Sequence, residues 1–243
     1  MRLRFVGRRL LTLTLALAIS CTHVLVVGVP VTFAACVKQW AYDVVTPSVV
    51  SDGGRMTWAL RDLHADDWAA GGFASEVLWV GTDSDPNRSN PNTWVEVGVT
   101  HGWQGQNVYT YYLARGDGAL YSEARITSIT PQVGAIHTFS GFRTSGPSLY
   151  NVSIDTTAIT LSPHVPDTKW FQGGLESTCD SSRVDNTYVS LIRQRRESDA
   201  YWLPVSQGSL GKEPSNGVGS VAWCTNPSSF RYSLHSQVPL ACQ

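Results

Sequence analysis

The chain has 243 residues, with 18 basic and 19 acidic side chains. Removing the N-terminal leader described below takes away four arginines and no acid, which leaves 14 basic residues against 19 acidic ones and a formal charge of −5. This balance excludes nucleic acid as a partner, because phosphate binding needs a basic surface. The 209 residues that follow residue 34 are enough for one sizeable domain, which would bury roughly 70% of its unfolded surface.

The first 34 residues predict a secretory signal peptide. Four arginines, at positions 2, 4, 8 and 9, precede an apolar run over residues 10–33, and the run ends in the small residues Ala34 and Ala35. We place the cleavage after Ala34, which makes the protein secreted and extracellular and leaves no membrane segment. The apolar run is also long enough to span a bilayer, so an uncleaved anchor is the alternative.

The cysteine count agrees with export. Cys21 lies inside the leader, and an even set of four cysteines remains for two disulfides in an oxidising compartment. The sequence allows three pairings of Cys36, Cys179, Cys224 and Cys242. We favour Cys36 with Cys242, because the termini of a domain often lie close together, and Cys179 with Cys224. Lipidation of Cys36 is the alternative, since residues 33–36 resemble a lipoprotein cleavage box, but it would leave one cysteine unpaired.

The rest of the chain reads as short strands separated by Gly, Pro, Asn and Asp. The first two lie at 55–61 and 76–81, and residues 62–72 between them predict a short helix or an ordered loop. Five strands follow at 93–100, 107–115, 120–126, 135–142 and 149–155. Further strands are expected at 159–162, 169–178, 187–195, 200–205, 219–223 and 230–235. No long stretch repeats every 3.6 residues, so the pattern predicts an all-β protein with one domain over residues 35–243, a two-sheet antiparallel β-sandwich.

Several motifs resemble those of a group of secreted bacterial proteins of unassigned function. They are WVEVGVTHGW, YYLARGDGALYSEARI, TPQVGAIHTF, SLYNVSID and GGLEST, and the similarity extends over approximately residues 74–235. The resemblance implies a concanavalin A-like jelly roll, the fold of lectins and glucanases, with a curved front sheet whose concave face could hold an extended sugar chain. It transfers no catalytic residues.

Alternating side chains in these strands suggest a ligand-binding face. In the strand at 93–100, Val95, Val97 and Val99 fall on one side, and Trp94 and Glu96 fall on the other. The candidate ligand-binding residues are Trp94, Glu96, Trp103, Tyr111, Tyr121, Glu123, Arg125 and His137, with Tyr109 as a further flanking ring. Flat rings stack on sugars, and carboxylates and arginines bind hydroxyl groups, so this set favours a glycan. The alternative is the ordinary solvated side of an antiparallel sheet.

Catalysis is the second functional hypothesis. Glu96, Glu123 and His137 are the candidate catalytic residues: the two glutamates would serve a glycoside hydrolase, and Tyr121, His137 and Arg125 would serve a polysaccharide lyase. The Glu-x-Asp-x-Glu pattern of the glucanases is missing. We therefore expect a lectin-like protein that binds an extracellular or cell-wall polysaccharide without cleaving it. A glycan-cleaving enzyme and a structural or protein-binding component are the alternatives, and the oligomeric state stays open.

No cofactor is expected. Glycine motifs that cradle phosphate are missing, which argues against a nucleotide. Asp83, Asp85 and Asn87 alternate like the first ligands of a calcium loop, although Asp, Asn, Pro and Ser are also ordinary turn residues. Calcium at this loop is the one metal that the sequence suggests.

Overall fold

The computed structural model describes most of the chain beyond the leader. The described residues are 38–81, 94–116, 121–144, 150–161, 170–178, 182–205, 210–214, 219–225 and 228–234. All of them belong to one compact unit, Phe33–Gln243. No helix within these ranges is both long and apolar enough to cross a membrane.

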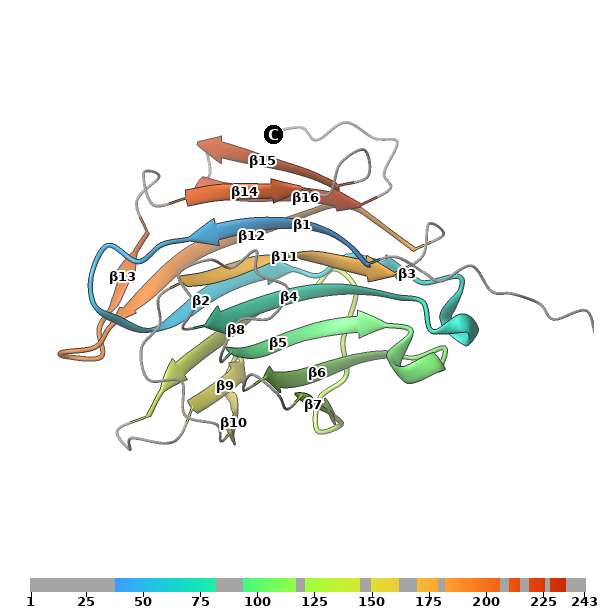
Figure 1. Ribbon diagram of the computed structural model, residues 1–243, viewed down its shortest axis with the longest axis horizontal. Coiled ribbons are helices and arrows are strands. Elements are labelled where there is room, and N and C mark those ends of the chain that lie inside the picture. Colours follow the sequence, from blue (N-terminus) through green and yellow to red (C-terminus); the bar gives the residue numbers. More distant parts are fainter. Residues whose placement is uncertain are drawn as a thin grey trace, which may run out of the picture. The chain divides into compact units, whose positions relative to one another are not determined.

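The first sheet has seven antiparallel strands (Figure 1). Their order is β14 (Leu210–Pro214), β1 (Lys38–Val45), β11 (Trp170–Thr178), β4 (Phe73–Gly81), β5 (Trp94–His101), β6 (Tyr109–Gly116) and β7 (Tyr121–Ile126). Strands β4 to β7 follow one another in the sequence, whereas β11 enters between β1 and β4 from far along the chain. Strands that are distant in the sequence therefore form the middle of this sheet.

The second sheet has nine strands and packs against the first. Its main path is β10 (Thr157–Leu161), β9 (Tyr150–Ile154), β8 (Ile136–Arg143), β2 (Ser51–Ala59), β12 (Arg183–Arg196), β16 (Ser228–Leu234) and β15 (Gly219–Thr225). Two short strands, β3 (Leu63–His64) and β13 (Trp202–Pro204), pair with β12. The long strand β12 thus holds four other strands in place.

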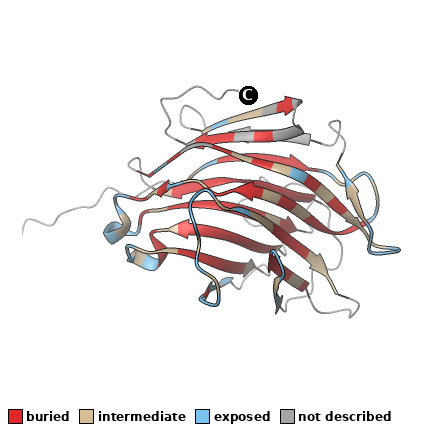
Figure 2. Cartoon of the chain, turned by 180° about the vertical axis from the view of Figure 1, so that it is seen from behind, coloured by how far each residue is buried: buried red, intermediate tan, exposed pale blue. Residues whose placement is uncertain are grey.

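The hydrophobic core lies between the two sheets. Val95, Val97 and Val99 of β5 point into it from the seven-stranded sheet, and Met56 and Trp58 of β2 enter it from the other sheet. Each set occupies alternate positions of its strand, as the pleat of a β-sheet requires. Figure 2 shows that most residues of the central strands are buried.

The expected all-β, two-sheet antiparallel fold is confirmed. Residues 62–72, predicted as a short helix or an ordered loop, contain β3 and the single 3₁₀ turn Trp68–Ala70. The leader, Cys36, Cys179, Cys242 and the candidate calcium loop at 83–87 lie outside the described residues. Cys224 is buried on β15, and the disulfide pairing stays a prediction.

Two carboxyl groups are buried in the interior between the sheets. The Asp43 carboxylate on β1 accepts hydrogen bonds from the Tyr232 hydroxyl and from the Gly173 amide. Burial nevertheless raises the pKa of Asp43 to about 7. Glu76 on β4 accepts hydrogen bonds from the Thr187 hydroxyl and the Arg61 amide, and burial raises its pKa to about 8. Within the described part of the chain, each of these side chains also has one oxygen without a hydrogen-bond partner, which favours the protonated form.

These two carboxyls predict that the fold loses stability as the pH rises. An unfolded Asp or Glu has a pKa of about 4, so in both cases the folded state binds its proton more tightly. The associated stability is fully present below about pH 4 and is lost as the pH rises through 7 to 8, by roughly 1 kcal/mol per pH unit for each group. Urea unfolding of the wild type between pH 5 and pH 8 measures this slope.

Asp43→Asn should flatten the slope, because a neutral amide mimics the protonated carboxyl and can still accept from Tyr232 and Gly173. Asp199→Asn is the matched control, since the Asp199 carboxylate is exposed and paired with Arg196. An Asp43→Asn protein whose stability falls with pH as steeply as the wild type would contradict the assignment.

Candidate functional site

The face of the seven-stranded sheet that points away from the core carries an unusual number of buried polar groups. Glu96 is 5% exposed and Glu176 is 3% exposed, and Gln172 on the same face is 1% exposed. The register places Glu96 and Gln172 on one line across the sheet, because Glu96 lies opposite Trp79 and Trp79 lies opposite Gln172, while Glu176 lies further along β11, opposite Ser75. We call this surface the outer face. Its polar side chains are shielded from water without belonging to the hydrophobic core, which is typical of a functional site.

Two tyrosines lie flat on the outer face because glycines stand beneath them. A Cβ atom at Gly98 would come within 3.1 Å of the Tyr112 ring, and one at Gly174 would come within 2.5 Å of the Tyr42 ring. Tyr112 donates a hydrogen bond from its hydroxyl to Glu96, and Tyr42 donates one to Glu176. The two glycines therefore allow the rings to reach the carboxylates.

The two carboxylates influence each other electrostatically. Burial is the main cause that raises the pKa of Glu96, to about 8, and the charge of Glu176 raises it further. The hydrogen bond from Tyr112 and the charge of Lys38 act in the opposite direction. The Lys38 ammonium lies 2.7 Å from Glu176 Oε1. The face therefore holds one carboxyl that keeps its proton at neutral pH and one carboxylate that is paired with a cation.

Gln172 is a buried amide with unused hydrogen-bonding capacity. Neither its Oε1 nor its Nε2 has a partner among the residues that the structure describes, although the side chain is almost fully buried. Two strand spacings, about 10 Å, separate its backbone from that of Glu96 across Trp79. Since buried polar atoms are nearly always hydrogen-bonded, this amide is suited to bind a polar group of a ligand at the outer face.

A row of aromatic rings crosses the outer face from β1 to β7. Successive ring centroids lie 6.4 Å apart from Trp40 to Tyr42, 5.5 Å from Tyr42 to Trp79, 5.7 Å from Trp79 to Trp94 and 5.9 Å from Trp94 to Tyr121. Both ends are open to solvent, because Trp40 is 38% exposed and Tyr121 is 62% exposed. The rings are tilted by 44° between Tyr42 and Trp79 and by 43° between Trp94 and Tyr121, so the row is a chain of contacting rings beside the buried carboxyls.

Six of the eight predicted ligand-binding residues lie together on this side of the sheet. Trp94 and Glu96 alternate on β5, and Tyr121, Glu123 and Arg125 alternate on β7, in register with the outer face. Trp103 packs against Tyr112 with the ring centroids 5.6 Å apart. Glu123 is only partly buried and accepts hydrogen bonds from Gln104 and Tyr121. Of the two candidate catalytic glutamates, only Glu96 is therefore in a low-dielectric environment.

The structure corrects the expectation for the other two, Tyr111 and His137, and for the flanking ring of Tyr109. The register turns Tyr111 and Tyr109 to the core face of β6, and Tyr111 is fully buried. His137 belongs to β8 of the nine-stranded sheet, where its Nδ1 lies 2.7 Å from Asp155 Oδ2. Period-two alternation assigns the sides of one strand but not the sheet to which the strand belongs, and His137 was therefore grouped with the wrong layer.

The sequence interpretation missed most of the buried cluster. Tyr42, Lys38, Glu176 and Gln172 were not singled out, because they lie on β1 and β11, which pair only in the folded chain. One signal was present: Gln172 and Glu176 alternate with glycine in residues 170–178, an odd pattern for a strand that must bury one face.

Metal binding gains no support within the described ranges, which hold no group of three His, Cys, Asp or Glu side chains that could ligate an ion. The candidate ligands Asp83, Asp85 and Asn87 lie outside those ranges, so calcium there stays a prediction.

Comparisons with known proteins support the fold. No family model and no curated protein matches the sequence. Among solved structures, scytalido-glutamic peptidase with a transition state analog inhibitor aligns with a TM-score of 0.56 and 11% identity over 82% of this chain and 99% of the peptidase. At this identity, the likeness shows the shared jelly-roll sandwich fold alone.

Two further solved structures match this chain only weakly. The agglutinin CG-16 from chicken liver has a TM-score of 0.36 and 14% identity over 60% of this chain and 98% of its own. The endo-β-1,3(4)-glucanase SCLam has a TM-score of 0.36 and 12% identity over 52% of this chain and 47% of its own.

The electrostatics of the outer face predict opposite pKa shifts for two variants. Tyr112→Phe removes a hydrogen bond that favours the ionised form of Glu96, so the pKa of Glu96 should rise. Glu176→Gln removes a neighbouring negative charge, so the same pKa should fall. NMR titration of ¹³C-labelled glutamate carboxyls measures both, and two shifts of the same sign would contradict the proposed coupling.

Proposed function

We propose that the outer face is the active site of a hydrolase in which Glu96 is the proton donor. The observation that carries this proposal is the pKa of Glu96, raised to about 8 by burial and by the charge of Glu176. A carboxyl that keeps its proton at neutral pH, together with a second carboxyl that forms an ion pair with Lys38, forms a pair suited to general acid and general base work.

The residues present can divide the steps of hydrolysis among them. Glu176 accepts a proton from the attacking water, and Glu96 donates its proton to the departing group as the bond to the substrate breaks. The Gln172 Nε2–H, which has no partner within the described ranges, donates a hydrogen bond to the oxygen that gains negative charge in the transition state. Trp79, between Glu96 and Gln172, supplies an apolar wall against the substrate.

The peptide bond is the first substrate that we propose. The protein that this fold matches over 99% of its length is named a glutamic peptidase, and here too a glutamate is the central group. The buried acid, the unpartnered amide and the open ends of the aromatic row suit an extended polymer that lies across the strands. With the predicted export signal, we propose a secreted peptidase that acts outside the cell.

Loss of the Glu96 carboxyl should abolish hydrolysis. Release of fluorescent peptides from a labelled unfolded protein substrate, measured from pH 3 to pH 8, should fall at least about 100-fold in Glu96→Gln, as expected for removal of a general acid. Asp199→Asn, on the exposed Arg196 pair, is the control and should keep full activity. A folded Glu96→Gln protein with wild-type activity would contradict the proposal.

We propose carbohydrate binding as the second candidate function, because the aromatic row favours it. Five rings on four strands, spaced 5.5 to 6.4 Å apart, suit stacking against the apolar faces of successive sugars. In this proposal the protein is lectin-like and recognises an extracellular or cell-wall polysaccharide. Both candidate functions would apply if the protein binds a glycan on the aromatic row and cleaves it with Glu96 as the acid.

Tyr121 and Tyr201 provide a matched test of sugar binding, since each is 62% exposed but only Tyr121 belongs to the aromatic row. In affinity electrophoresis through gels containing neutral polysaccharides, Tyr121→Ala should bind about 3- to 10-fold more weakly, the value of one stacked ring. Tyr201→Ala should migrate like the wild type. Equal losses in the two variants, or no retardation on any polysaccharide, would argue against this function.

A further inference from the structure

The face of the nine-stranded sheet that points away from the core carries a pair of arginines directly opposite each other. Arg55 of β2 pairs in register with Arg193 of β12, so their Cβ atoms lie about 5 Å apart. Neighbouring Met56 and Trp58 enter the core, which leaves Arg55 on the outside of the sheet. Like charges in directly opposite positions destabilise a sheet, and such a pair therefore requires a compensating interaction.

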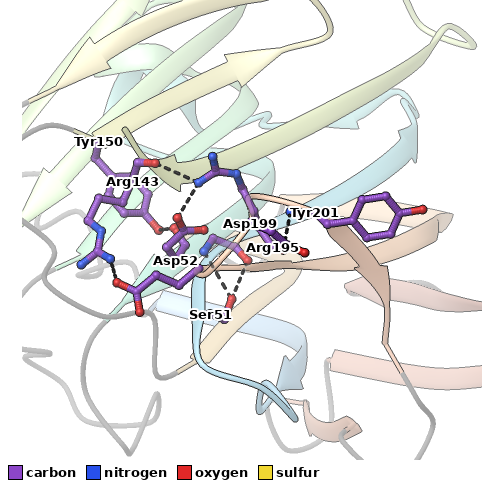
Figure 3. Close-up of polar contacts among 9 residues, drawn as sticks. Ser51, Asp52, Arg143, Tyr150, Arg195, Asp199 and Tyr201 are labelled. Atoms are coloured by element: carbon purple, nitrogen blue, oxygen red, sulfur yellow. Dashed lines mark hydrogen bonds and ion pairs between the residues drawn. The ribbon is translucent and has the colours of Figure 1, made fainter. Parts of the chain in front are cut away.

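Other arginines of this region have that compensation. Arg195 donates to the Asp52 carboxylate and to the Arg143 carbonyl, and Arg143 forms an ion pair with Glu197 (Figure 3). Arg196 pairs with Asp199 through two nitrogens. The local rule in this part of the sheet is therefore one carboxylate for each guanidinium.

Arg55 and Arg193 depart from this rule. Neither has an acidic partner among the residues that the structure describes, and both are held by Trp202 of β13 instead. The Arg55 guanidinium lies 4.5 Å from the Trp202 ring, and Arg193 Nη1 lies 3.4 Å from the Trp202 carbonyl oxygen. Both side chains are half-buried. Their positions are thus fixed by an aromatic ring and a backbone carbonyl, while their charges stay unneutralised.

We propose that Arg55 and Arg193 form a binding site for an oxyanion, a carboxylate, sulfate or phosphate group of a ligand. Guanidinium groups from directly opposite positions of two strands offer several N–H donors in one place, and such donors recognise planar carboxylates and tetrahedral oxyanions. Ser140 lies opposite Arg55 on the neighbouring strand β8, but it is buried and its hydroxyl is hydrogen-bonded to Ser153, so the site rests on the two arginines. A bound anion would remove the repulsion between the two cations.

The electrostatics of the free protein agree with this site. Burial lowers the pKa of Arg55, and the charge of Arg193 lowers it further. The two positive charges therefore repel each other when no anion is bound. The site lies on the opposite sheet from Glu96 and uses none of the residues proposed for hydrolysis. Either proposal can therefore fail without the other.

Isothermal titration of the full chain at low ionic strength tests the site with three probes: inorganic sulfate, inorganic phosphate and glucuronate. We expect saturable binding of at least one probe, and the preferred probe identifies a sulfate ester, a phosphate ester or an acidic sugar as the source. Arg55→Gln and Arg193→Gln should each weaken binding at least tenfold. Arg196→Gln, which removes a guanidinium already paired with Asp199, should bind like the wild type.

A second readout covers the case in which a variant is poorly folded. Without anion, Arg193→Gln should melt at the same temperature as the wild type or higher, because the repulsion with Arg55 is gone. Arg193→Lys keeps the charge but loses the paired donors, so its affinity should fall between those of Arg193→Gln and the wild type. Failure of all three probes to bind saturably, or unchanged affinity in a folded R55Q/R193Q protein, would overturn the proposal.

Discussion

The outer face depends on the antiparallel register of two strand pairs, β1 with β11 and β5 with β6. In each pair, the register places a tyrosine directly opposite a glycine. Tyr42 lies opposite Gly174 and Tyr112 lies opposite Gly98, so each ring can lie flat across the sheet. Only flat rings bring the hydroxyls to Glu176 and Glu96, and those hydrogen bonds make buried carboxyls tolerable. A side chain at either glycine would lift a ring and break the hydrogen bond from that tyrosine to its buried acid.

The sequence predicted the class of fold well, because strand alternation and turn residues are local signals. Alternation correctly predicted that Trp94 and Glu96 lie on one side of their strand and that the valines lie on the other, core-facing side. It could not place Glu176, which becomes a neighbour of Tyr42 only when residues more than 130 positions apart pair. His137 shows the same limit, since alternation cannot tell which of two sheets a strand will join.

Strand β1 carries proton-binding chemistry on both of its sides. Tyr42 faces outward toward Glu176, while the next residue, Asp43, points into the core toward Tyr232. Burial raises the pKa of Asp43 to about 7, and that of Glu96 to about 8 on the outer face. The fold and the proposed site therefore depend on protons over the same range of pH, and both are expected to be in their protonated form in mildly acidic surroundings.

The charges on the two faces argue for different ligands. On the outer face, Glu96 keeps its proton at neutral pH and Glu176 is already paired with Lys38, so a neutral peptide or sugar chain fits there. On the nine-stranded sheet, Arg55 and Arg193 have the opposite preference, because only an anion relieves their repulsion. A substrate that carries occasional acidic groups along a mostly neutral chain would satisfy both faces. The two sheets would then hold separate parts of the same class of polymer, one for reaction and one for attachment.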